Sequence, residues 1–174
     1  MPRQPKRKEP AQPTPSNGNG VQALIKELWQ AAVNLRGSIE PADYKRYVLP
    51  IIFLRFLSLR YERRRAELEK LIATPGSEFH TTDAKSAARI LKDEDEYKAV
   101  GALLVPEEAR WDTIVQQARA DDIKVRLDKI LERLEDRFPK LRGLLGRPFG
   151  GSNLDAENVR GLITLFSKDV FKEH

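Results

Sequence analysis

The sequence of 174 residues contains no cysteine, and its only two histidines, His80 and His174, lie far apart. The absence of cysteine excludes disulfide scaffolds, thiolate zinc sites, iron–sulfur clusters and cysteine nucleophiles. Two histidines at this separation argue against a histidine-based metal site and against a histidine-centred catalytic triad. Neither a metal ligand set nor a catalytic triad is therefore predicted.

Long apolar runs are also absent. The longest near-apolar run extends from Val48 to Leu54 and ends at Arg55. A membrane-spanning helix needs about 20 apolar residues, and no apolar stretch of the signal-peptide type follows the basic N-terminus. We therefore expect a soluble, cytoplasmic protein that does not enter a membrane.

Motifs for nucleotide or cofactor binding are missing as well. The only glycine-rich candidate, Pro148-Phe-Gly-Gly-Ser, follows a loop rather than a strand and lacks a third glycine, so a hinge or cap is favoured over a phosphate loop. The paired carboxylates Asp93/Asp95 and Asp121/Asp122 lie in charged segments, which is typical of solvated surface. We predict no catalytic, cofactor-binding or metal-binding residue, and no catalysis by this chain alone.

The first 20 residues differ in composition from the rest. They hold five of the eleven prolines, no aromatic residue and a net charge of +3, which predicts a disordered basic tail. The remaining residues, 21–174, carry a net charge of only +2. The tail has two open interpretations, weak contact with nucleic acid or a merely solubilising leader.

Helical periodicity dominates residues 21–174, and no alternating strand pattern occurs. Apolar residues recur at spacings of three and four in three clear stripes, which predict amphipathic helices. The stripes are Val21, Leu24, Ile25, Leu28, Trp29 and Ala32; Ile123, Leu127, Ile130, Leu131, Leu134 and Phe138; and Val159, Leu162, Ile163 and Phe166. We predict an all-α fold, a helical bundle of about six helices.

A long helix is predicted from about Pro41 to Leu71. Proline suits the first helical turn, and Asp43 suits the positive end of the helix dipole. Pro50 falls inside this helix, where proline costs about 3 kcal/mol. The residues after it are apolar on nearly all sides, so we expect a kinked, buried helix at the centre of the core rather than a break.

Basic residues accumulate towards the end of the long helix, from Arg60 to Lys70. One interpretation is a basic ridge that faces phosphate. The other is a solvated face with ion pairs such as Arg63–Glu67 and Arg65–Glu69 at four-residue spacing. The candidate DNA contacts are Lys45, Arg46, Arg60, Arg63 and Arg64.

Aromatic residues also have two interpretations. Trp29, Trp111, Tyr44, Tyr47, Tyr61 and Tyr97 could stack on bases. Because they lie within apolar stripes at helical spacing, a place in the core or at an interface is favoured. For Trp29 we expect the core.

Several motifs in order resemble one protein family, the modification subunit of type I restriction–modification systems, over residues 24–167. They are Leu28-Trp29, Ala31-Ala32 and Leu35-Arg36-Gly37; Asp43-Tyr44-Lys45; Tyr61-Glu62-Arg63-Arg64; Val105-Pro106 with Ala109-Arg110-Trp111; Phe138-Pro-Lys-Leu-Arg-Gly-Leu-Leu; and the segment from Asn153 to Ser167. The resemblance implies that residues 21–174 are the N-terminal helical domain of a DNA methyltransferase acting on adenine N6.

The same resemblance implies a catalytic domain, a cofactor and partners beyond these residues. In this family an S-adenosylmethionine loop and an Asn-Pro-Pro-Tyr/Phe motif belong to a later catalytic domain, and neither occurs in this sequence. We therefore expect a catalytic domain downstream, and S-adenosylmethionine as the cofactor of that domain. The implied partners are DNA, the specificity subunit, a second modification subunit and the restriction subunit of the full complex.

Three functions remain open from the sequence. The first is a non-catalytic domain that clamps DNA and assembles subunits. The second is a pure protein-interaction domain that docks on the specificity subunit or the catalytic domain. The third is a self-contained helical DNA-binding regulator, which ranks last because no helix-turn-helix pattern is present.

Overall fold

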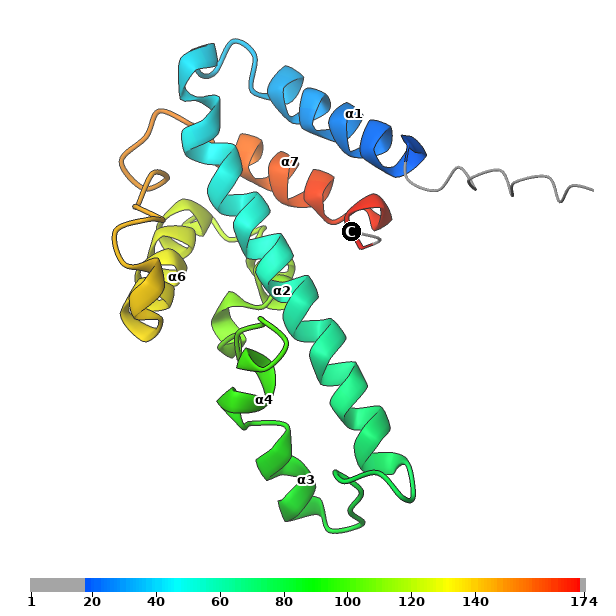
Figure 1. Cartoon of the computed structure of the whole chain (residues 1–174). Coiled ribbons are helices and arrows are strands. Elements are labelled where there is room, and N and C mark those ends of the chain that lie inside the picture. The colour runs from blue at the N-terminus through cyan, green and yellow to red at the C-terminus, as the bar shows by residue number, and fades with distance from the viewer. Residues whose placement is uncertain (1–17, 173–174) are drawn as a thin grey trace, which may run out of the picture.

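The computed structural model describes residues 18–172, which form seven α-helices and no β-strand (Figure 1). Within this range the all-α prediction is confirmed. Residues 1–17 of the predicted disordered tail lie outside the described residues. The last three residues of that tail, 18–20, belong to the first helix, which begins at Gly18. The helices are α1 (Gly18–Asn34), α2 (Tyr44–Ala73), α3 (Ala84–Ile90), α4 (Glu94–Lys98), α5 (Trp111–Gln117), α6 (Ile123–Arg137) and α7 (Ala156–Phe166).

Helix α2 is the long axis of the molecule, and the other helices are arranged around it (Figure 1). Its first half lies near α1, α7 and α6, and α3 and α4 lie along its second half. A turn at Gly37, with a φ of 87°, separates α1 from the short 3₁₀ turn η1 (Pro41–Asp43) that leads into α2. This positive φ favours glycine, because other residues are strained there.

The predicted long helix is confirmed, and it continues through Pro50. Proline has no N–H to give to the carbonyl of Arg46 one turn earlier. Pro50 is nevertheless buried inside α2, which runs without interruption to Ala73. Tertiary packing therefore outweighs the local cost of the proline, because α2 buries Tyr47 before Pro50 and Ile51 and Leu54 after it.

The core lies between one face of α2 and the apolar stripes of α6 and α7. Along α2 the inward side chains include Tyr47, Ile51, Leu54, Tyr61 and Leu68. All the predicted apolar positions of the α6 stripe and of the last helix are buried, so both stripes are confirmed.

Only part of the predicted apolar stripe of α1 faces the core, where Leu24 packs against it. Val21, Ile25, Leu28 and Trp29 are exposed, and Trp29 shows 64% of its surface to solvent. The expectation that Trp29 belongs to the core is wrong. Helix α1 lies at the edge of the domain and contacts α7; Ala31 within it and Leu35 just after it are fully buried.

Helix α1 packs against α7, and Ala31 of α1 is fully buried. An ion pair between Glu27 of α1 and Lys168, 2.8 Å long, reinforces this packing. Four other aromatic residues are buried as expected, namely Tyr47, Tyr61, Tyr97 and Trp111.

Candidate functional site

The solvent-facing side of α2 has an unusual order of side chains. Lys45 and Arg46 come first, then the apolar Leu49, Phe53 and Phe56, then Arg60, Arg63 and Arg64. Steps of three and four residues place these side chains on one face of the helix. The face therefore has an apolar centre between two basic ends, which lie about 25 Å apart at 1.5 Å per residue.

Three hollows follow this face of α2. The first, of about 350 Å³, is lined by Lys45, Arg46, Leu49 and Pro50. The second, of about 280 Å³, is lined by Phe53, Phe56, Leu57 and Arg60. The third, of about 250 Å³, is lined by Arg60, Arg63, Arg64 and Glu67.

The opposite wall of these hollows comes from two loop segments. Residues 144–148 face the first hollow, Leu141 and residues 101–103 face the second, and Val100 and Ala102 face the third. The second and third hollows share Arg60 and Ala102. We call the whole feature the α2 groove, a depression between α2 and the segments 100–103 and 141–148.

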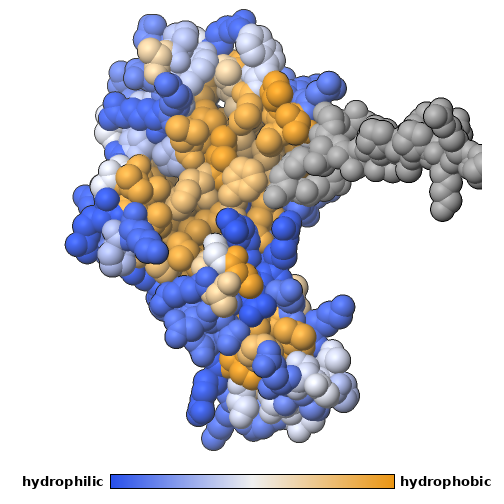
Figure 2. Space-filling view, in the orientation of Figure 1, coloured by the Kyte–Doolittle hydropathy of each residue, from blue (hydrophilic) through white to orange (hydrophobic). Residues whose placement is uncertain are grey.

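The centre of the α2 groove is apolar and open to solvent. Leu49 is 56% exposed and Leu144 is 72% exposed, and Phe53 and Phe56 are half-buried. Figure 2 shows apolar surface gathered over the first half of α2 and the neighbouring segments. The sequence run from Ile51 to Leu57 was expected at the centre of the core, but only its Ile51, Leu54, Arg55 and Leu57 positions are buried.

Sequence reasoning therefore missed the groove, although a signal for it was present. A helix that is apolar all round has more apolar surface than one core-facing stripe requires. In α2 the surplus forms an outer face with the exposed Leu49 and the half-buried Phe53 and Phe56. Contiguous exposed apolar surface of this kind marks interaction sites in soluble proteins.

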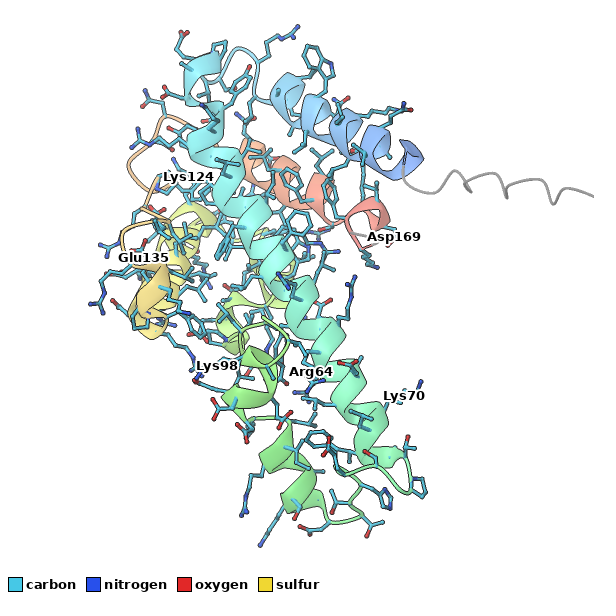
Figure 3. All side chains as sticks on the ribbon, in the orientation of Figure 1. Arg64, Lys70, Lys98, Lys124, Glu135 and Asp169 are labelled. Carbon is cyan, nitrogen blue, oxygen red and sulfur yellow. The ribbon has the colours of Figure 1, made fainter. Side chains whose placement is uncertain are left out.

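Arg64, one of the predicted DNA contacts, is engaged within the domain. Its Nε donates to the Glu96 carbonyl oxygen at 2.9 Å, and its Nη2 and Nη1 reach the carboxylates of Glu96 at 3.0 Å and Glu67 at 2.8 Å. Its side chain is only 11% exposed, and Figure 3 shows it between α2 and α4. Arg64 therefore ties α2 to α4 rather than offering a free cation.

The other four candidates, Lys45, Arg46, Arg60 and Arg63, form no ion pair with any described residue between 18 and 172. Lys45 and Arg46 lie at one end of the apolar centre, and Arg60 and Arg63 lie at the other. The expected ion pair Arg65–Glu69 is present at 3.0 Å. The expected pair Arg63–Glu67 is replaced, because Glu67 binds Arg64 instead.

Two carboxylates of α6 fix the groove wall at residues 143–151. Glu135 accepts from the amide of Leu145 at 2.7 Å, and Figure 3 shows it beside this loop. Hydrogen bonds from the backbone N–H groups of Leu145, Gly146 and Gly143 lower the pKa of the Glu135 carboxyl below its ordinary value. Asp128 accepts from the amides of Phe149 at 3.0 Å and Gly150 at 2.6 Å.

The Pro148-Phe-Gly-Gly-Ser segment therefore offers no phosphate cradle. Its amides at Phe149 and Gly150 already donate to the Asp128 carboxylate. A Cβ at position 150 would lie 2.9 Å from Asp128 Oδ2, so glycine permits this close approach. The segment is held against α6 by Asp128, and its Pro148 lines the first hollow.

Trp111 joins three elements in the core. Its backbone N–H donates to the Ser58 hydroxyl of α2 at 2.7 Å, and its Nε1–H donates to the Ser167 hydroxyl after α7 at 3.0 Å. The neighbouring Arg110 lies over the Tyr61 ring at 4.8 Å. The motif of Val105, Ala109, Arg110 and Trp111 therefore serves packing, because Val105, Ala109 and Trp111 are buried in the core.

Arg55 is a buried charge inside α2 that the sequence pattern did not predict. Its guanidinium lies over the Trp111 ring at 5.3 Å, and its Nε has no hydrogen-bond partner among residues 18–172. Burial lowers the pKa of Arg55, although Glu62 and Asp169 oppose this effect. Burial also raises the pKa of the Glu62 carboxyl, against the attraction of Arg55.

The described part of the chain lacks two other kinds of feature. No group of three or more His, Cys, Asp or Glu side chains there is placed to hold a metal ion. No described helix is long and apolar enough to cross a membrane. The α2 groove is thus the candidate functional site that the geometry offers.

Comparison with known proteins places these features in a family. A family model described as the HsdM N-terminal domain matches residues 24–166. The type I restriction enzyme MjaIX methylase subunit of Methanocaldococcus jannaschii is 38% identical over 150 residues, which are 85% of this chain and 27% of that relative. The chain thus spans about a quarter of the relative's length. Because the model covers most of the chain and contains both walls of the α2 groove, the chain belongs to the family of HsdM N-terminal domains found in type I restriction enzyme methylase subunits.

Proposed function

We propose that this chain is a non-catalytic subunit-assembly and DNA-clamping domain of a type I methylase subunit, and that assembly is its primary role. The observation that carries the proposal is the exposed apolar centre of the α2 groove, formed by Leu49, Phe53, Phe56 and Leu144. Solvent-exposed apolar surface of this extent is costly in water unless a partner covers it. The exposed stripe of α1, with Ile25 and Trp29, offers a second such surface.

The chemistry of the complete subunit belongs to the same proposal. The family resemblance implies transfer of a methyl group from S-adenosylmethionine to adenine N6 in host DNA, in the cytoplasm. None of the 174 residues forms the family's cofactor loop or its Asn-Pro-Pro-Tyr/Phe motif, so we assign methyl transfer to a separate catalytic domain. The partners we propose are DNA, the specificity subunit, a second methylase subunit and the restriction subunit.

The assembly role can be tested in the complete methylase subunit. Leu49→Glu together with Phe53→Glu places two charges in the apolar centre of the groove. We expect the variant subunit to remain folded and to bind S-adenosylmethionine, but to lose co-elution with the specificity subunit in size-exclusion chromatography. Val115→Glu is the matched control, because Val115 is an exposed apolar residue of α5 that lines none of the three hollows. Unchanged co-elution of the groove variant would contradict the role.

DNA clamping is a second candidate function that competes with docking of a partner helix, because it would use the same cations of the α2 groove. Lys45, Arg46, Arg60 and Arg63 lie on one face of α2 and form no ion pair with another described residue. If all four neutralise phosphates of duplex DNA, the logarithm of the binding constant falls with the logarithm of salt concentration with a slope of about −4. Fluorescence anisotropy with a labelled duplex measures this slope. A variant with all four residues changed to glutamine should then show a slope smaller in magnitude by about 4, and equal slopes would exclude the contact.

A further inference from the structure

We propose that the α2 groove is the docking site for an amphipathic α-helix of another protein, one whose central apolar stripe is flanked by carboxylates at both ends. The proposal rests on the assembly role above and specifies the chemistry of the partner. It follows from the order of side chains along the groove, basic then apolar then basic.

The centre of the groove fits apolar side chains from a helix. Phe53, Phe56 and Leu57 form one wall of the second hollow, and Leu103 and Leu141 form the other. Leu49 and Leu144 extend this apolar lining into the first hollow. These hollows, of about 280 and 350 Å³, follow one another along α2.

The ends of the groove select the charge of the partner. Lys45 and Arg46 line one end, and Arg60 and Arg63 line the other. Carboxylates at matching positions would satisfy these cations, whereas cations would repel them. Glu67 is the one acidic side chain that lines the three hollows, and Arg64 already neutralises it.

The length of the groove sets the length of the docked helix. Arg46 and Arg63 are 17 residues apart on α2, which corresponds to about 25 Å, or nearly five turns. A partner helix of about 18 residues spans that distance. Apolar side chains at spacings of three and four over its middle turns would meet the hollows.

Other occupants fit the groove less well. Duplex DNA would set its phosphates against the aliphatic Leu49, Leu103, Leu141 and Leu144, which offer no hydrogen bond. A second copy that pairs groove to groove would set cations against cations at both ends. Residues 1–20 of this chain carry a net charge of +3, so their charge also opposes the basic ends.

A designed peptide tests the proposal directly. The probe is a fluorescein-labelled helical peptide of about 18 residues with leucines at spacings of three and four in its centre and two glutamates in each terminal turn. Its control carries lysines in place of those glutamates. We expect the 174-residue chain to bind the glutamate peptide at least about tenfold more tightly than the lysine peptide in fluorescence anisotropy.

Variants of the chain locate the binding. Phe53→Glu should abolish binding of the glutamate peptide, and Arg60→Glu with Arg63→Glu should weaken it about tenfold while improving binding of the lysine peptide. Lys129→Glu is the charge control, because Lys129 is exposed on α6 and lines none of the three hollows. Circular dichroism confirms that each variant is folded.

Four results would overturn the proposal. They are equal affinity for the two peptides, binding that survives Phe53→Glu, self-association of the chain through the groove in sedimentation, and displacement of the glutamate peptide by equimolar duplex DNA. If the peptide fails to bind while Leu49→Glu with Phe53→Glu still prevents assembly of the complete subunit, the partner chemistry is wrong and the assembly role stands. If both tests fail, the assembly role fails as well.

Discussion

The two faces of α2 have similar sequences and different surroundings. The inner face carries Ile51, Leu54 and Tyr61, which are buried against the other helices. The outer face carries the exposed Leu49 and the half-buried Phe53 and Phe56 between two basic ends. The spacing of apolar residues along the sequence predicts that a helix face is apolar. Whether the domain itself buries that face depends on the tertiary fold.

The apolar residues of the two faces should differ most in their effect on stability. Leu54→Ala removes a fully buried side chain and should lower the free energy of unfolding by about 2–5 kcal/mol. Leu49→Ala removes a side chain from the outer face and should change it by less than about 0.5 kcal/mol. Urea denaturation of both variants measures the difference, and equal losses would mean that the outer face belongs to the core.

A polar contact on the inner face gives the next largest effect. Ser58→Ala leaves the backbone N–H of Trp111 without its acceptor in a buried position. Such a change should lower the free energy of unfolding by about 1–3 kcal/mol. Ser77→Ala is a suitable control, because Ser77 lies in the turn after α2, and its effect should be clearly smaller in the same urea titration.

Two adjacent arginines sharpen the comparison at the basic end of the groove. Arg64→Ala removes the contacts with Glu96 and Glu67 and should lower the free energy of unfolding by about 1 kcal/mol. Arg63→Ala should leave stability within about 0.5 kcal/mol of the original and should weaken binding of the glutamate peptide. The reverse pattern, with Arg63 stabilising and Arg64 binding, would contradict the assignment of these two residues.

The smallest expected effect concerns the groove wall and depends on pH. The amides of residues 145 and 146 lower the pKa of Glu135. Its stabilising contribution is therefore complete above the ordinary carboxyl value of 4.5 and is lost as the pH falls through the lowered folded-state value. Glu135→Gln should be less stable at neutral pH and should lose less stability on acidification.

Thermal unfolding at several pH values between neutral and acid measures this dependence. Asp136→Asn is the matched control, because Asp136 is exposed on the same helix and makes no contact with the loop amides. Identical acid curves for Glu135→Gln and the original chain would show that this carboxylate does not hold the wall.

Much of the fold was predictable from local signals. The stripe from Ile123 to Phe138 and the stripe from Val159 to Phe166 predicted helices whose apolar faces are buried, because each faces the core along its whole length. The helix through Pro50 was predictable because the apolar pattern continues on both sides of the proline.

Long-range features were not predictable in the same way. The stripe containing Trp29 resembles a core stripe, but Trp29 is exposed while Ala31 of the same helix is fully buried. The role of Arg64 depends on Glu96, which lies 32 residues away and reaches it only in the folded chain. The second wall of the groove comes from residues 100–103 and 141–148, whose position opposite α2 no local pattern encodes.

The central claim is that the outer face of α2 meets an acid-flanked helix of a partner protein. It can be tested most directly by placing a photo-crosslinking phenylalanine analogue at Phe53 in the complete subunit and sequencing the cross-linked peptide. The account predicts a peptide with apolar residues at spacings of three and four between acidic residues, and loss of the cross-link after Arg60→Glu with Arg63→Glu. Cross-linking to DNA, or to a peptide without acidic flanks, would contradict the account.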